Sequence, residues 1–286
     1  MAGGRWPWHD GRTIALWVVF GILLTSYILQ QWLCVFTTPR SRSFPVHLLA
    51  SRTQVLLGIT TASNVAVCFF VIYFIPLYFQ FVHGDGALLA AVRLLPFITS
   101  MSPPAWLGLL SSLGSGLLMG YIKTSTSQGV IYGILVLLGF GSGLTFSMGF
   151  SVSTLKVKPS AIGNVVSFQD ICRLGSSTIV LVIAGQVFQS RATANFEHVL
   201  AGKGFSSADI QGAVAGAQST LFKQLDASLK LEAISAITEA IQRTFVLTIV
   251  GAAIMTLAGA CMRVDKIFEA RSTRLDESEA TQLPLP

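Results

Sequence analysis

Residues Gln54–Val82 read QVLLGITTASNVAVCFFVIYFIPLYFQFV, a stretch that contains no Asp, Glu, Lys or Arg. A helix rises about 1.5 Å per residue and the hydrocarbon core of a bilayer is about 30 Å thick, so about 20 apolar residues complete one crossing. The stretch therefore predicts a membrane-spanning helix over 54–82. Pro76 is expected to kink this helix without ending it, because groups nearby in a helix bundle can satisfy the backbone carbonyl that proline leaves unpaired.

The composition of the whole chain indicates the same class of protein. Hydrophobic residues make up 52% of the 286 and charged residues 11%, whereas soluble domains carry roughly 25% charged residues. The mean hydropathy of +0.67 agrees. We predict an all-α polytopic membrane protein, integral to the lipid bilayer. The net charge of +6 comes from sparse basic residues beside apolar runs, which indicates loops facing a cytoplasmic leaflet and no binding of nucleic acid.

Enzyme chemistry finds no support in the sequence. The four histidines fall in loops or flanks, and the four cysteines lie within or at the ends of apolar runs without metal-ligand spacing. The glycine-rich run 139–143 has no strand before it and no phosphate-binding lysine after it. We expect no catalytic residues, no metal and no cofactor.

Further apolar runs predict more membrane-spanning helices. Three of them also lack charged residues, namely 13–36, 130–155 and 244–262. A fourth, 165–189, contains Asp170 and Arg173. Residues three apart share one face of a helix, so we expect these two side chains to neutralise each other inside the span.

The stretch from Ala87 to Ile122 determines how many spans there are. Ser102-Pro103-Pro104 interrupts its helical pattern, and proline blocks helix continuation. Read as a hairpin of two short helices, 88–102 and 105–122, the chain has about seven transmembrane helices. The basic loop residues then gather on one side, as the positive-inside rule requires. This predicts a short outer leader at 1–12, a cytoplasmic tail at 263–286 that is largely disordered, and the N-terminus outside.

One long loop is expected, from 190 to 243, on the extracellular side. Its later part carries an apolar stripe at mostly three- and four-residue steps, at Leu221, Leu225, Leu229, Ile234, Ile237 and Ile241. Such a stripe is typical of an amphipathic helix, and we expect this one to lie in the membrane interface.

Polar residues within the spans are the candidate functional residues. An ionisable side chain in a span costs at least about 2.5 kcal/mol unless it pairs or meets water, so Arg93, Asp170 and Arg173 either line a substrate path or serve as structural anchors near the interfaces. Asn64, Tyr73 and Gln80 are polar enough to line the same path. Glycines four apart let helices approach closely in lipid, which predicts helix packing at Gly116, Gly120, Gly139 and Gly143.

Four segments resemble a known family. They are GRTIALWVVF at Gly11–Phe20, FPVH at Phe44–His47, IPLYFQ at Ile75–Gln80 and AVRLLPF at Ala91–Phe97. In order and spacing they are similar to fungal fourteen-helix drug:proton antiporters of the major facilitator superfamily. The resemblance extends from Gly11 to about Phe268 and covers what would be the eighth to the fourteenth helix. It implies a major-facilitator-like C-terminal half.

The same resemblance implies a function. Such proteins export small hydrophobic or amphiphilic compounds, often fungal secondary metabolites or toxins, through the plasma membrane, with protons as the coupling ion. Their N-terminal half, which carries the proton-coupling motifs, has no counterpart here. Around Ser102–Trp106 the family would carry more of one helix, a basic cytoplasmic loop and the start of the next helix, and these are missing as well. We therefore expect a truncated half that needs an N-terminal partner. The alternatives are a seven-span receptor, on topology alone, and a non-transporting fragment from an incomplete gene model.

Overall fold

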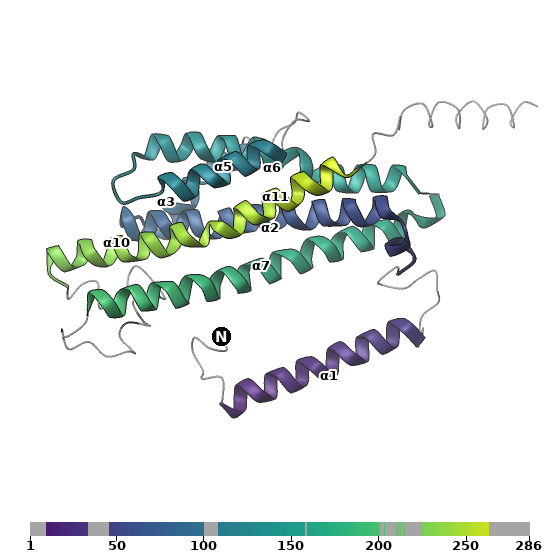
Figure 1. Cartoon of the computed structure of the whole chain (residues 1–286), viewed down its shortest axis with the longest axis horizontal. Helices are drawn as coiled ribbons and strands as arrows, with labels where there is room; N and C mark the ends of the chain where they lie inside the picture. Colours follow the sequence, from purple (N-terminus) through teal and green to yellow (C-terminus); the bar gives the residue numbers. More distant parts are fainter. Residues whose placement is uncertain are drawn as a thin grey trace, which may run out of the picture.

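The computed structural model describes residues 10–33, 46–99, 108–157, 159–200 and 225–262, with residues 203, 210, 212 and 214 between the last two ranges. Every regular element in this part of the chain is a helix (Figure 1). The α-helices are α1 (Gly11–Leu33), α2 (Arg52–Val82), α3 (Ala87–Val92), α4 (Leu95–Thr99), α5 (Gly108–Tyr121), α6 (Gln128–Leu155), α7 (Ile162–Val199), α10 (Ala227–Thr244) and α11 (Val246–Ala260), and 3-10 turns occupy Val46–Ala50 and Pro159–Ala161.

Helix α2 is the centre of the bundle. It contacts α6, α7, α10 and α11, and it is buried on several sides (Figure 1). A helix that is apolar all round must be surrounded by other helices or by lipid, which explains the central position of α2. Its aromatic side chains form the core: Phe70 stacks on Phe74 with centroids 4.4 Å apart, and Phe245 meets Phe70 edge-on at 5.0 Å. Helices α10 and α11 continue one another in the same direction along α2 (Figure 1).

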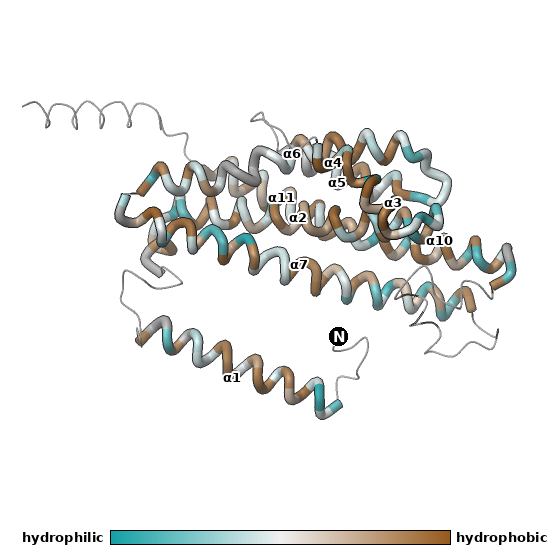
Figure 2. The backbone as a smooth tube through the Cα atoms, turned by 180° about the vertical axis from the view of Figure 1, so that it is seen from behind, coloured by the Kyte–Doolittle hydropathy of each residue, from teal (hydrophilic) through white to brown (hydrophobic). Residues whose placement is uncertain are grey.

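Helix α1 stands apart from the other helices (Figure 1). Most of its large apolar side chains are exposed, and the tube coloured by hydropathy shows apolar residues along its whole length (Figure 2). An apolar helix of 23 residues that is exposed all round suits lipid and not water.

Three helical segments are long and apolar enough to cross a membrane, namely Arg52–Val82, Ile162–Val199 and Ser228–Ala260. Shorter apolar helices lie at Gly11–Tyr27, Ala87–Thr99 and Gln128–Gly143. The third long segment joins α10 to α11 with only a local tightening at Phe245, whose N–H bonds to the carbonyl of Gln242.

The predicted single helix over 88–102 is wrong. The structure has two short helices, α3 and α4, separated by a turn at Arg93 and Leu94. Pro96 explains the break, because proline donates no N–H and its ring clashes with the carbonyl four residues earlier. The join between the two arms of the predicted hairpin lies outside the described residues.

The predicted loop from 190 to 243 also needs correction. Residues 190–199 continue α7, which is 38 residues long, and α10 packs against this extension. The buried face of α10 includes Ala233, Ile237 and Ile241, and Asn195 of α7 donates to the carbonyl of Ala236 at 3.0 Å. The apolar stripe therefore meets another helix, and the position of this helix at the membrane interface stays a prediction. The predicted leader, except residues 10–12, and the tail at 263–286 lie outside the described residues.

Candidate functional site

A line of polar side chains runs between α2 and α6. The side-chain amide of Gln54 donates to the carbonyl of Ser153 at 3.1 Å, and that of Asn64 donates to the carbonyl of Ser142 at 2.9 Å. The paired residue numbers rise along α2 while they fall along α6, as they must for antiparallel neighbours. Both amides are buried, at 2% and 0% exposure. These bonds fix the register of the two helices.

Helix α7 joins this line through Gln169. Its side-chain amide donates to the Ser153 hydroxyl at 2.6 Å, so two glutamines from different helices converge on one serine. Gly149 lies one helical turn from Ser153, and a Cβ there would overlap the hydroxyl of Thr61. The absence of a side chain at 149 thus lets α2 and α6 approach closely. We call Gln54, Thr61, Asn64, Ser142, Gly149, Ser153 and Gln169 the polar seam.

Several buried side-chain oxygens of the polar seam have no donor from the described residues. The side-chain oxygens of Gln54, Thr61, Asn64 and Gln169 are buried and have no hydrogen-bond partner among the described residues. An unsatisfied buried polar group costs about 1–3 kcal/mol, so four cost roughly 4–12 kcal/mol. That is comparable with the whole net stability of a typical domain, about 5–15 kcal/mol. A polar seam with a purely structural role would therefore lower the stability of the fold considerably.

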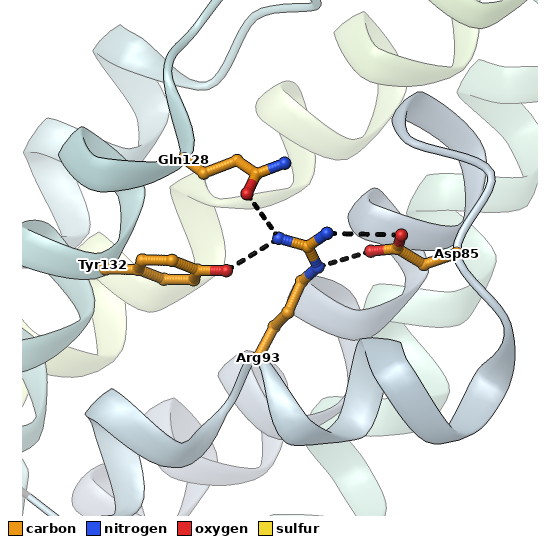
Figure 3. A network of polar contacts seen from close by, with 4 residues as sticks. All are labelled: Asp85, Arg93, Gln128 and Tyr132. Carbon is orange, nitrogen blue, oxygen red and sulfur yellow. Dashed lines mark hydrogen bonds and ion pairs between the residues drawn. The ribbon is translucent and has the colours of Figure 1, made fainter.

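A second polar cluster surrounds Arg93, at the end of the bundle where α2 turns into α3 (Figure 3). Its guanidinium forms an ion pair with Asp85 through Nε, and Nη2 donates to the same carboxylate at 3.3 Å. Nη1 donates to Gln128 at 2.6 Å and to the hydroxyl of Tyr132 at 2.7 Å. The cation also lies over the ring of Phe79, 4.7 Å from its centroid.

This arrangement makes Arg93 a clamp between helices. Both side chains of the Arg93–Asp85 ion pair are largely buried, with exposures of 14% for Arg93 and 9% for Asp85. Each guanidinium nitrogen already has a partner among the described residues, so the arginine ties the α2–α3 turn to α6 and keeps at most one N–H, on Nη2, for a further acceptor. Tyr132 and Gln128 come from the first turns of α6, where the antiparallel packing places them opposite the turn.

His83 borders the Arg93 cluster and lies just after the end of α2, outside the predicted membrane-spanning segment. Its ring stacks on Phe79 with centroids 5.4 Å apart and planes inclined by 27°. Desolvation by this packing lowers the pKa of His83 below its ordinary 6.5, the Arg93 cation lowers it further, and the carboxylate of Asp85 opposes both. His83 is therefore held in its neutral form at neutral pH.

The structure places the other predicted path residues unequally. Asn64 belongs to the polar seam, whereas Tyr73 is 55% exposed on the outer side of α2 and Gln80 is half-buried. Asp170 and Arg173 are both half-buried on α7. No ion pair joins these two within the part of the chain that the structure describes, contrary to the expected mutual neutralisation. The role of these residues in a substrate path stays a prediction.

The predicted packing glycines divide into two pairs. Gly139 and Gly143 are buried in α6. Gly116 and Gly120 are exposed, and a Cβ at either position meets no atom within 4 Å, so they pack against no described helix and their role in helix packing stays a prediction. The contact between α5 and α6 is made instead at Gly114, where a Cβ would lie 3.0 Å from the Cβ of Leu138.

Most polar seam residues were not predicted from the sequence. Gln54, Thr61 and Gln169 lie within or beside apolar runs, and Ser142, Gly149 and Ser153 lie among other small residues. The only available signal was a polar amide in an apolar run, which is the signal that identified Asn64.

Comparison with known proteins agrees with this architecture. No family model matches the sequence. The chain is 38% identical over 274 residues to the efflux pump patC of Aspergillus clavatus, a match covering 90% of this chain and 50% of that protein. It is 37% identical over 290 residues to the MFS-type transporter pgmG of Aspergillus terreus, covering 95% and 51%. The chain belongs to the major facilitator superfamily.

Membership of the major facilitator superfamily bears out the expected fold class of an all-α polytopic membrane protein. A third relative, the phomenoic acid biosynthesis cluster MFS-type transporter of Leptosphaeria maculans, is 31% identical over 301 residues, covering 93% of this chain and 48% of that protein. The chain spans about half the length of the relatives it matches and corresponds to their C-terminal half. These relatives are named as transporters or efflux pumps, which supports the expectation that the chain is not an enzyme. Their names give no support to the alternative of a seven-span receptor.

Proposed function

We propose that this chain forms the C-terminal half of an efflux transporter for a small hydrophobic or amphiphilic compound, such as a fungal secondary metabolite. One observation carries the proposal. The chain matches about half of two proteins named efflux pumps along 90% and 93% of its own length, at 38% and 34% identity. The transporter works in the plasma membrane and is driven by protons.

In this proposal, the N-terminal half of the transporter is supplied by another segment of chain. Transporters of this architecture bind substrate between two helical halves and alternate access by moving one against the other. The chain therefore works with an N-terminal half, whether on the same polypeptide or on another. The apolar exposed sides of α1, α5 and α7 offer surface for that half and for lipid.

Expression in a yeast strain that lacks its own drug efflux pumps tests the activity. The chain is expressed alone, with the N-terminal half of the Aspergillus clavatus efflux pump as a second polypeptide, or fused to that half. We expect at least a fourfold rise in tolerance to one or more hydrophobic compounds only where both halves are present. The same tolerance in all arms and in the empty strain, with both halves seen at the plasma membrane, would refute the proposal.

Proton coupling is tested separately. Efflux from cells with both halves is measured with and without a protonophore, while ATP is held constant by a fermentable sugar. We expect efflux to fall at least fivefold when the proton gradient is collapsed. Unchanged efflux would reject proton coupling and leave the transport proposal standing.

A further inference from the structure

The polar seam is chosen for further inference because its unpartnered atoms cluster. Apart from the facing atoms of the Asp85 and Arg93 ion pair, the buried side-chain atoms of the described residues that lack a partner are four oxygens, and all four lie in this seam. They belong to Gln54, Thr61, Asn64 and Gln169, whose exposures are 2%, 1%, 0% and 0%. Three of these oxygens are amide oxygens that only accept, and the Thr61 hydroxyl can both accept and donate, so together they point to a ligand that donates hydrogen bonds and can also accept one.

The acceptors form a track with a start and an end. Gln54 lies two residues inside the start of α2, and its partner Ser153 lies two residues before the end of α6, so this layer borders one end of the bundle. Asn64 lies ten residues further along α2. At about 1.5 Å per residue this is about 15 Å, roughly half of the 30 Å hydrocarbon thickness. The track thus leads from one end of the bundle to its middle.

Two of the acceptors are near enough for one small ligand to bridge. The hydroxyl of Thr61 and the side-chain oxygen of Gln169 both lie within 3.6 Å of the position that a Cβ on residue 149 would take. The ligand is small, because the seam is buried to 2% exposure or less at each acceptor. The seam residues include no carboxylate, and the described residues contain no cluster of three or more His, Cys, Asp or Glu side chains, which argues against a transition metal or a divalent cation. Arg173 also acts electrostatically on Cys68, one turn beyond Asn64, and a nearby cation disfavours a second one.

We propose that the polar seam binds a chain of water molecules that enters at Gln54 and ends at Asn64. Each water donates to a seam oxygen that has no protein donor, as buried waters commonly do for such groups. The seam is then a hydrated half-channel inside one helical half. Water-mediated bonds exchange partners at little cost, so the water molecules can rearrange while the direct amide bonds keep the register of α2, α6 and α7. This proposal requires only that the chain spans a bilayer, and it does not depend on the proposed transport activity.

Water-edited solid-state NMR of the full chain in lipid vesicles tests the proposal. The measured quantity is the rate at which water magnetisation reaches the Cβ of individual threonines. Thr248 of α11 is the matched control, because it is also 1% exposed but its hydroxyl donates to the carbonyl of Phe245 at 2.7 Å. We expect transfer to Thr61 to be at least threefold faster than transfer to Thr248. Equal rates, whether both slow or both fast, overturn the proposal.

A variant pair then locates the water. Gly149→Ala places a methyl group where the Thr61 hydroxyl lies, and we expect it to reduce the Thr61 rate to that of Thr248. Gly133→Ala is the control on the same helix, because a Cβ there meets no atom within 4 Å, and it should leave the rate unchanged. Should Gly149→Ala fail to fold, Gln169→Met removes one acceptor and should reduce the Thr61 rate at least twofold. A rapid Thr61 rate that survives these substitutions overturns the proposal, since the water would then reach Thr61 by another route.

Discussion

Removing Arg93 is the most informative single change to this bundle. Arg93→Met deletes the partner of the Asp85 carboxylate and leaves Gln128 and Tyr132 without the donor they share. Breaking a buried ion pair costs about 3–5 kcal/mol, and we expect the lower end, about 3 kcal/mol, because Asp85 lies in a turn at the end of the bundle. Asp85→Asn should cost less, about 1.5–3 kcal/mol, since the guanidinium keeps two of its acceptors.

A double-mutant cycle separates the ion pair from the packing around it. The combined variant Arg93→Met with Asp85→Leu removes both charges, and replacing a whole buried pair by apolar groups is often close to neutral. We therefore expect the double variant to be more stable than Arg93→Met alone, with a coupling energy of about 2 kcal/mol or more. The measurement is the free energy of unfolding by urea in mild detergent, followed by tryptophan fluorescence.

The control for this cycle is an exposed ion pair of the same chain. Arg243 and Glu239 lie four residues apart on α10, with side-chain exposures of 66% and 56%. Arg243→Met should change stability by no more than about 0.5 kcal/mol. Arg93 and Asp85 effects that add within about 0.5 kcal/mol would refute the clamp, because independent sites add to within that margin.

Two further predictions concern packing and pH. Gly114→Ala should destabilise the protein by about 1–3 kcal/mol in the same unfolding assay, because the new Cβ lies 3.0 Å from the Cβ of Leu138. Gly116→Ala, with open space around it, should be neutral or stabilise by up to about 1 kcal/mol through helix propensity, and equal effects at both positions would contradict the packing described here. The lowered pKa of His83 means that the folded protein binds fewer protons than the unfolded chain just below pH 6.5, so stability is retained above that pH and falls as the pH drops below it. Unfolding measured from pH 7.5 to 5 should show this slope, and His83→Gln should flatten it, whereas an unchanged slope would assign it to other groups.

The sequence predicted those features that depend on local composition. Uncharged runs such as 54–82 and 130–155 became α2 and α6 within a few residues at each end, because a segment that must satisfy its own backbone in lipid has few alternatives to a helix. The break at Arg93 was missed although Pro96 is visible in the sequence. The apolar pattern continues on both sides of that proline, so the pattern alone does not show where the chain turns.

The features that depend on which face meets which neighbour could not be predicted. Gln54 meets Ser153 across 99 residues and Asn64 meets Ser142 across 78, and no local pattern encodes such distances. Glycine spacing shows that Gly116 and Gly120 share a face, but it does not show whether that face is covered. The amphipathic stripe of α10 posed the same difficulty, because another helix and a membrane interface both reward one apolar face.

The extension of α7 has a mechanical consequence. Of its 38 residues about 20 suffice to cross the hydrocarbon layer, so an untilted α7 with all its excess at one end would project about 18 residues, roughly 27 Å of helix, beyond it. Helix α10 braces this projection along its length (Figure 1). The pair is a lever arm rigidly attached to the bundle, and tilting the bundle by about 15° would move the tip by about 7 Å. A fluorescent label near Val199 or Ala227 would report such tilting far more sensitively than a label within the membrane.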